Sequence, residues 1–129
     1  MKHRAVSTGN QWEKRYGYAR AVRAGSTVCC TGTVAINPDG SPHAPNDAYA
    51  QAARCFEIIE KAFKELGATK ENIIRTRMFV TDIARADDFG RAHKDFFQTH
   101  SPCLTMVEVA RLIDDSYLIE IEADAVVGD

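Results

Sequence analysis

The feature that most constrains the fold is one amphipathic segment, predicted as a helix over residues 46–66. Its apolar side chains recur at steps of three and four residues and so share one face: Ala52, Cys55, Phe56, Ile59, Phe63 and Leu66. Asn46 or Asp47 can cap its start, and Gly67 can end it. At about 1.5 Å per residue the helix is about 30 Å long. It therefore requires an apolar surface of similar length to cover, which a small sheet provides.

Extended segments are predicted on both sides of this helix, over residues 2–7, 20–24, 26–32, 72–83, 103–112 and 117–127. Gly25 suits a tight turn between the second and third segments. The run from Asn37 to Gly40 (NPDG) predicts another turn, which closes a hairpin with the strand before it. A second helix is predicted over residues 85–99, where the apolar residues are Phe89, Ala92, Phe96 and Phe97. This pattern indicates an α+β fold in a single domain, residues 1–129.

Alternation along the predicted strands assigns their side chains to two faces. Ile119 and Ile121 form an apolar face for both helices to cover, and Ile74, Met78 and Val80 are expected to lie on an apolar face as well. The opposite face is expected to mix charged and apolar side chains: Arg75, Arg77, Leu104, Met106, Glu120 and Glu122. A mixed face of this kind is either solvated or buried against other subunits around a partly polar interior, and we expect the second arrangement.

Composition narrows the functional classes. Hydrophobic residues make up 45% of the 129 residues and the net charge is −2, so a globular protein is expected and nucleic acid is not an expected partner. Neither a targeting segment nor an apolar run of membrane-spanning length is apparent, which predicts a cytoplasmic protein. The four cysteines are expected to be reduced and mostly buried, because Cys29 and Cys30 point to opposite faces of a strand.

Few residues carry chemistry by pattern alone. No cysteine or histidine spacing favours a metal site, no glycine-rich run opens a helix, and no serine lies in a nucleophile motif. Glu120 and Glu122 point the same way from a strand, and a carboxylate packed against an apolar neighbour has its pKa raised toward use in proton transfer. Structural ion pairing with nearby arginines, among Arg75, Arg77 and Arg111, explains the same carboxylates equally well.

Several segments together resemble the reactive intermediate deaminase (Rid) family, also known from its YjgF member. Val107–Leu112 (VEVARL) followed by Ile119–Ala123 (IEIEA) is similar to the C-terminal signature of that family. Tyr18–Val22 resembles its early Tyr-x-x-Ala-Val segment, Thr31–Thr33 resembles its Ser-Gly-x turn, and residues 72–82 resemble its strand ending in Phe-x-x-Asp. The resemblance covers residues 18–127.

The resemblance implies a chorismate-mutase-like α+β fold with two helices on one face, assembled as a homotrimer with ligand clefts between subunits. Family members with the full motif hydrolyse 2-imino acids, or the enamines in equilibrium with them, to 2-oxo acids and ammonia without a cofactor or metal. Their Pro-x-Arg segment holds the substrate carboxylate through its arginine. Here the segment begins at Pro102 and the arginine position is Leu104, which offers no hydrogen-bond donor.

The resemblance further implies roles for five residues. Glu120 is the candidate catalytic residue and would position water, while Tyr18, Thr33, His93 and Leu104 would line the cleft. The expected function is binding of a small metabolite, with hydrolysis of an imine or enamine. Leu104 is expected to alter which imine or enamine the protein accepts. The alternative is a non-catalytic ligand-binding or sensor trimer. The ribonuclease and translation-inhibitor activities attributed to some members are less favoured by the acidic charge balance.

Overall fold

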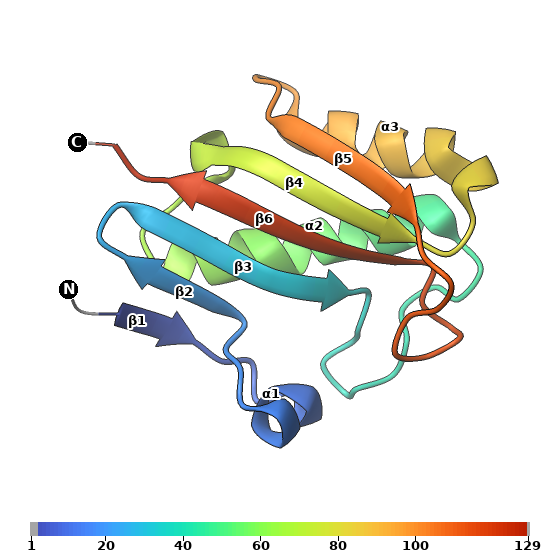
Figure 1. The fold of residues 1–129 in the computed structure, drawn as a ribbon, viewed down its shortest axis with the longest axis horizontal. Coiled ribbons are helices and arrows are strands. Elements are labelled where there is room, and N and C mark those ends of the chain that lie inside the picture. The colour runs from blue at the N-terminus through green and yellow to red at the C-terminus, as the bar shows by residue number, and fades with distance from the viewer. Residues whose placement is uncertain (1–2, 129) are drawn as a thin grey trace.

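Within residues 3–128, which the computed structural model describes, six strands form one mixed sheet in the order β1-β2-β3-β6-β4-β5. The strands are β1 (His3–Val6), β2 (Ala21–Ala24), β3 (Thr27–Val34), β4 (Ile73–Val80), β5 (Cys103–Glu108) and β6 (Ile119–Val126). β4 and β5 run parallel, and the other neighbouring pairs are antiparallel. Two long helices, α2 (Ala48–Glu65) and α3 (Ala86–Phe97), lie behind one face of the sheet (Figure 1). The predicted α+β fold with two helices on one face is confirmed.

The long predicted helix is α2, and its ends follow local chemistry. The side chain of Asp47, not that of Asn46, caps the start by accepting a hydrogen bond from the Ala50 N–H. Gly67 has φ +79°, so the chain leaves the helix through a left-handed residue as predicted. Arg4 and Arg23 both donate to the carbonyl of Leu66, which satisfies an acceptor at the end of the helix.

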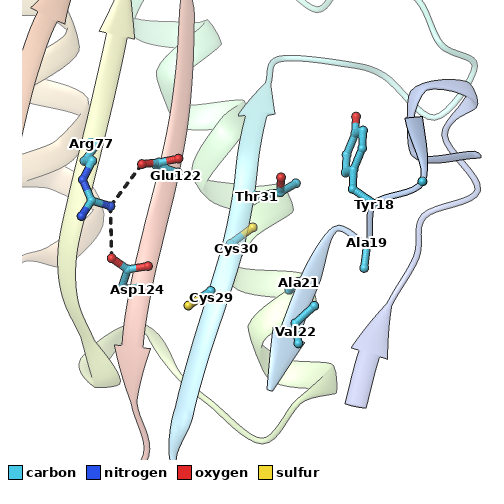
Figure 2. A pocket seen from close by; sticks show the side chains of 11 residues that line it. Tyr18, Ala19, Ala21, Val22, Cys29, Cys30, Thr31, Arg77, Glu122 and Asp124 are labelled. Atoms are coloured by element: carbon cyan, nitrogen blue, oxygen red, sulfur yellow. Dashed lines mark hydrogen bonds and ion pairs between the residues drawn. The ribbon is translucent and has the colours of Figure 1, made fainter. Parts of the chain in front are cut away.

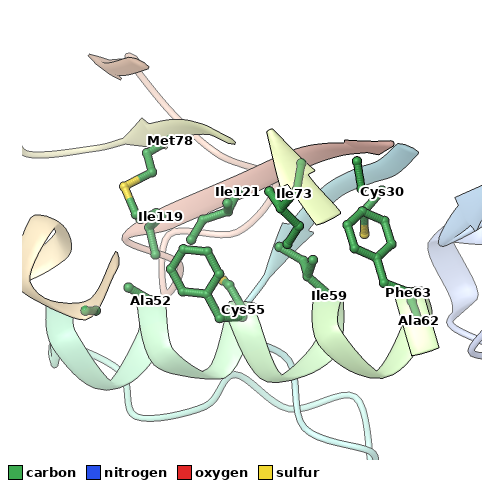
Figure 3. Close-up of a cluster of buried hydrophobic side chains, with 14 of the residues drawn as sticks. Cys30, Ala52, Cys55, Ile59, Ala62, Phe63, Ile73, Met78, Ile119 and Ile121 are labelled. Atoms are coloured by element: carbon green, nitrogen blue, oxygen red, sulfur yellow. The ribbon is translucent and has the colours of Figure 1, made fainter. Parts of the chain in front are cut away.

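The core lies between α2 and the sheet. Cys55, Ile59 and Phe63 point from the helix toward Ile73, Met78, Ile119 and Ile121 on β4 and β6 (Figure 3). All seven side chains are at most 1% exposed. Full burial of an aliphatic or aromatic side chain contributes about 1.5–3 kcal/mol, so this layer is a main source of stability. α3 packs beside α2 through stacked and edge-on rings, including Phe56 against Phe96 and Phe97.

Two face assignments made from alternation are wrong. The pairing of β4 with β6 shifts register between Ile73 and Arg75, so Ile73 is buried and Ile74 is 53% exposed instead of lying in the core. On β5, Leu104 pairs with Thr76 and Met106 with Met78. Residues in register on adjacent strands share a face, and Thr76 and Met78 are fully buried. Leu104 and Met106 therefore lie on the helix side of the sheet.

Other differences concern short elements. α1 (Gln11–Tyr16), capped by Asn10 and ended by Gly17, was not predicted, and short 3₁₀ turns (η1, Lys70–Asn72; η2, Ile83–Arg85) precede β4 and α3. The predicted hairpin at the NPDG turn is reduced to one bridge, between Ile36 and Pro42. The first predicted strand begins at Lys2, which lies outside the described residues. None of the helices within residues 3–128 has the length and apolar character needed to cross a bilayer.

Candidate functional site

Glu120 lies on the sheet face that α2 and α3 leave uncovered, between apolar neighbours. Its register partners are Phe79 on β4 and Val34 on β3, and Phe79 is in turn paired with Val107 on β5. Glu120 is half-buried. Burial is the main cause that raises its pKa above the ordinary value for a glutamate, the nearby Glu122 charge raises it further, and the Arg20 charge opposes both. A carboxylate in this setting binds a proton more readily than an exposed one.

Gly32 gives the Glu120 side chain its place. A Cβ atom added at Gly32 would overlap the carboxylate of Glu120, so only glycine permits this close approach. The pairing of β3 with β6 shifts register between Cys30 and Thr33, at the point where Gly32 meets Glu120. The predicted Thr31–Thr33 turn is thus a bulge within β3, and it brings the strand backbone against the candidate catalytic carboxylate.

Thr33 is beside this bulge but does not line an open face with Glu120. Its side chain is 1% exposed and its register partner is the core residue Ile121. The Thr33 hydroxyl donates to the Thr31 carbonyl and accepts a hydrogen bond from Arg20. Its role in the structure is to hold the bulge.

A buried ion pair connects this bulge to α1. Arg20 Nε donates to Glu13 Oε2 at 3.3 Å, and Arg20 Nη1 donates to the Gly32 carbonyl and the Thr33 hydroxyl, each at 3.0 Å. Glu13 and Arg20 are only 3% and 5% exposed. Sequence reasoning missed Glu13, which belongs to a helix too short to show periodicity. The pair fixes the Arg20 charge close enough to Glu120 to affect its pKa.

Tyr18 borders a cavity of about 530 Å³ on the uncovered face (Figure 2). Its ring centroid is 5.8 Å from the Arg20 guanidinium carbon, a cation–π distance. Across the cavity, Arg77 Nη1 donates to Glu122 and to Asp124, each at 3.1 Å. Glu122 and Arg77 are therefore structural ion-pair partners, whereas Glu120, two residues earlier on the same strand, remains the carboxylate with a raised pKa.

His93 on α3 and Leu104 on the edge strand β5 both lie beside Thr76 of β4. His93 Nε2 is 2.8 Å from the Thr76 hydroxyl, and burial lowers the pKa of His93 to about 4, so the ring is neutral at pH 7. Leu104, in register with Thr76 on β5, is 40% exposed. Within one chain Tyr18 and Glu120 both lie near Arg20. Leu104 is separated from them by β4, and His93 is on α3, on the other side of the sheet. In residues 3–128, His, Cys, Asp and Glu nowhere cluster as three or more potential metal ligands.

Comparisons with known proteins agree with this fold. A family model described as "Endoribonuclease L-PSP" matches residues 8–127. An uncharacterized protein of Streptomyces coelicolor is 36% identical over 97% of this chain and 92% of its own length. The Escherichia coli protein named 2-iminobutanoate/2-iminopropanoate deaminase is 31% identical over 84% of this chain and 86% of its own length.

Solved structures give the same match at the level of the backbone. The crystal structure of a Mycobacterium tuberculosis member of the YjgF/YER057c/UK114 family has a TM-score of 0.89 and 39% identity, covering 98% of this chain and all of its own. The structure of Escherichia coli TdcF with bound serine has a TM-score of 0.80 and 31% identity, covering 86% of this chain and 88% of its own.

Proposed function

Because this chain belongs to the Rid family, the YjgF-type family whose sequence model is described as endoribonuclease L-PSP, we propose that it binds a small metabolite beside Glu120 and hydrolyses an imine or enamine. A similar protein named 2-iminobutanoate/2-iminopropanoate deaminase supports this reaction class. The proposed substrate differs from that of the full-motif members in its carboxylate, because Leu104 replaces the arginine that would hold it.

The observation that carries the proposal is the setting of Glu120. A general base works best when its pKa lies near the working pH, and burial between Phe79 and Val34 moves the pKa of Glu120 in that direction. In the proposed step Glu120 takes a proton from water as the water oxygen bonds to the carbon of the protonated C=N group, which gives a neutral carbinolamine. Glu120 then returns that proton to the nitrogen. The C–N bond breaks as the C=O bond forms, and the departing ammonia takes up the hydroxyl proton and leaves as ammonium. No electron is exchanged with an outside reagent, so the step calls for no redox cofactor.

Leu104 defines the expected substrate range. A guanidinium that forms a hydrogen-bonded ion pair with a carboxylate in a cleft contributes on the order of 2–5 kcal/mol to the free energy of binding, and leucine cannot replace its donors. Turnover of 2-iminopropanoate and 2-aminoacrylate, whose carboxylates would form that ion pair, is therefore expected to be weak. An imine or enamine with an apolar group in place of the carboxylate fits Leu104 better.

The proposed active unit is a homotrimer. Leu104 and His93 are separated from Tyr18 and Glu120 within one chain, so a single cleft that contains all four would need residues from two subunits. The uncovered sheet face supports such contacts, because Ile74 and Val107 are 53% and 42% exposed. Burial of apolar surface between subunits would stabilise the assembly.

A matched pair of variants tests the reaction. Ammonia release is measured with a panel of imines generated by an amino-acid or amine oxidase, comparing Glu120→Gln with Glu122→Gln. Both carboxylates lie on the same face of β6, but Glu122 is paired with Arg77. We expect Glu120→Gln to lower kcat at least about 100-fold and Glu122→Gln to lower it by less than about tenfold. Equal losses, or a wild-type rate equal to spontaneous hydrolysis for every imine, would remove the hydrolase proposal.

Leu104→Arg tests the substrate assignment separately. If leucine alone restricts the range, the variant should gain activity on 2-iminopropanoate. Wild-type rates that match a full-motif relative would contradict the assignment and point to another cation, such as Arg20, whose charge acts on Glu120. A charge placed on the helix side of the sheet near Thr76 and His93 would instead lower stability, which thermal unfolding of the variant detects.

The second candidate is a non-catalytic ligand-binding or sensor trimer. It is favoured by Leu104, which removes the anchor of the known reaction while leaving the fold intact. Ligand-induced stabilisation without ammonia release distinguishes it from the hydrolase. Ribonuclease activity is less favoured, because the net charge of −2 gives little attraction for a phosphate backbone. Four free cysteines within the described chain support the further proposal of a reducing, cytoplasmic location.

A further inference from the structure

The largest cavity described here is not beside Glu120 but between the N-terminal segment and α2. It measures about 660 Å³ and is bounded by residues 6–11, by β3 and the loop after it from Thr33 to Gly40, and by one side of α2. The β2–β3 ladder ends at the pair Ala21–Cys30, so this part of β3 has no strand beside it on that edge. The cavity fills the gap between that edge and α1.

The floor of the cavity contains a buried cation with spare donors. Arg20 lines the cavity and is only 5% exposed. Its Nε and Nη1 atoms are used by Glu13, Gly32 and Thr33, whereas Nη2 has no hydrogen-bond partner within residues 3–128. Among residues 3–128, His100 Nδ1 is the only side-chain nitrogen or oxygen that is both buried from solvent and without a hydrogen-bond partner. Arg20 Nη2 also lacks a partner, so it must be accessible to solvent. Arg20 therefore lines the cavity and also has donors that no other group within residues 3–128 uses.

Arg20 is ion-paired with Glu13 through Nε, which leaves Nη2 as the donor without a partner within residues 3–128. Glu13 also accepts hydrogen bonds from the Ser7 hydroxyl, the Thr8 hydroxyl and the Thr8 N–H. These donors stabilise the charged form of Glu13 and hold its carboxylate beside Arg20. Lys61 and Arg54 add positive charge at the rim, although Arg54 is already bonded to Glu57 and to the Ile36 carbonyl.

Part of the cavity lining is apolar, and it includes Val6, Val34, Ile36, Ile58 and Ala62. A cation and aliphatic side chains in one cavity match a small molecule with one carboxylate and a short aliphatic body, since charged and apolar parts both find partners. The acidic residues that line the cavity, Glu57, Glu65 and Asp39, are exposed, and we expect them to contribute less than the buried cation.

We propose that this cavity is a binding site for small aliphatic carboxylates, with Arg20 Nη2 as the deep anchor and Lys61 as a second contact at the rim. The site is separate from the cavity beside Tyr18 and does not depend on imine hydrolysis. Arg20 would then bind a ligand carboxylate at a position different from that of Leu104.

The test is a titration of ¹⁵N-labelled protein with sodium butanoate at low salt, with butanamide as the neutral probe of the same shape. Saturable shifts in residues 6–11 and 33–37 with butanoate, and at least about fivefold weaker effects with butanamide, are expected. Equal responses to the two probes, or butanoate shifts confined to Leu104, Arg77 and their neighbours, would overturn the proposal.

Two charge reversals on α2 provide a matched control. Lys61 lines the cavity, whereas Lys64, three residues later on the same helix, does not line it. Lys61→Glu is expected to weaken butanoate binding about fivefold and Lys64→Glu less than twofold. Equal effects would contradict a contact at the rim.

The anchor itself is tested by the double variant Glu13→Gln with Arg20→Gln, which removes both buried charges and avoids leaving one unpaired. Loss of butanoate binding with retained amide dispersion supports the proposal, and retained binding overturns it. If the double variant does not fold, Ile58→Glu places a negative charge on the cavity wall at a half-buried helix position and is expected to abolish binding. Unchanged binding by that variant would also overturn the proposal.

Discussion

At the scale of single residues, close packing and burial set the chemistry of the candidate site. Glu120 has its raised pKa because its neighbours on both strands are apolar, and it has its position because Gly32 leaves room for the carboxylate. His93 is neutral for a similar reason, since burial beside aromatic rings removes the water that would solvate its charge. Each effect leads to a prediction for one substitution.

Gly32→Ala is expected to displace the Glu120 carboxylate toward solvent and to bring its pKa back toward 4.5. The clash involves the end of a flexible side chain, so the loss of stability should stay within about 1 kcal/mol. A ¹³C NMR titration of the glutamate carboxyl groups measures the pKa directly. Gly90→Ala is the control, because a Cβ atom there meets nothing within 4 Å. An unchanged Glu120 titration would show that Gly32 does not position it.

His93 predicts a specific loss of stability in mild acid. Its folded pKa of about 4 lies below the ordinary 6.5, so between these values the unfolded chain binds a proton that the folded chain excludes. His93 protonation therefore does not reduce the free energy of unfolding above about pH 6.5. As the pH drops toward 4 it lowers that free energy, by about 2 kcal/mol at pH 5. Urea unfolding of wild type and His93→Gln at pH 7 and pH 5 isolates the effect. The glutamine variant should lack this component, and parallel losses in both proteins would refute the assignment.

At the scale of elements, side chains that bridge backbone segments keep the helices and strands in register. Gln51 on α2 is fully buried. Its side-chain amide both donates a hydrogen bond to, and accepts one from, the backbone of the segment that leads into β6. Its Nε2 donates to the Ser116 carbonyl and its Oε1 accepts from the Leu118 N–H, each at 2.8 Å. Because this contact lies just before Glu120, it joins the main helix to the strand that carries the candidate catalytic residue.

Gln51→Ala is therefore expected to lower the free energy of unfolding by about 2–4 kcal/mol, because two backbone groups lose their partner. Denaturant unfolding measures the loss. Lys64→Ala is the control on the same helix, where an exposed side chain should change stability by less than about 0.5 kcal/mol. A similar small change at Gln51 would mean that water replaces its hydrogen bonds without cost.

At the scale of the whole molecule, one side of the sheet is covered by α2 and α3 and the other is open (Figure 1). The open side contains Val107 and Ile74 as well as ion pairs, a mixture that suits a partly polar interface. The distribution of cysteines follows the same division, since Cys30 and Cys55 are buried, whereas Cys29 and Cys103 are exposed. The expectation of mostly buried cysteines is therefore correct for only two of the four.

The proposed homotrimer predicts a molar mass three times that of the chain by light scattering at micromolar concentration. Val107→Glu should dissociate it, because a charge on the open face would be buried without a partner. Ile83→Glu, at a similarly exposed isoleucine in η2 outside the sheet, should leave the mass unchanged. A stable wild-type monomer contradicts the trimer.

The cysteines predict that dithiothreitol leaves the melting temperature unchanged, because all four are free within the described residues. In the Cys29→Ser/Cys103→Ser variant, native protein should not react with a thiol-specific disulfide reagent over minutes. Burial raises the pKa of Cys30 to about 11 and also raises the pKa of Cys55, so little thiolate forms at pH 7. Rapid reaction of the folded variant, or a drop in melting temperature on reduction, would contradict this view.

Local sequence patterns were enough to predict the elements that repeat regularly and pack on an apolar surface. The periodicity of residues 48–65 predicted α2, and the alternation around Ile119 and Ile121 predicted the core face of β6 and, with it, the open side for Glu120. These patterns are local, because each helix or strand repeats its own geometry over several residues. The shared order of short motifs then indicated the family, although none of them alone would have done so.

Contacts between residues distant in the sequence depend on how the strands and helices pair in the folded chain. The shifts at Ile73–Arg75 and Cys30–Thr33 depend on how neighbouring strands pair, and they exposed Ile74, buried Thr33 and placed Gly32 against Glu120. Leu104 lies on the helix side for the same reason, since its face follows from its pairing with Thr76. A one-residue change of register reverses the face of every following side chain, and the partners that set register are distant in sequence. The Arg20–Glu13 pair and the cavity above it likewise arise from the docking of α1 beside the edge of β3.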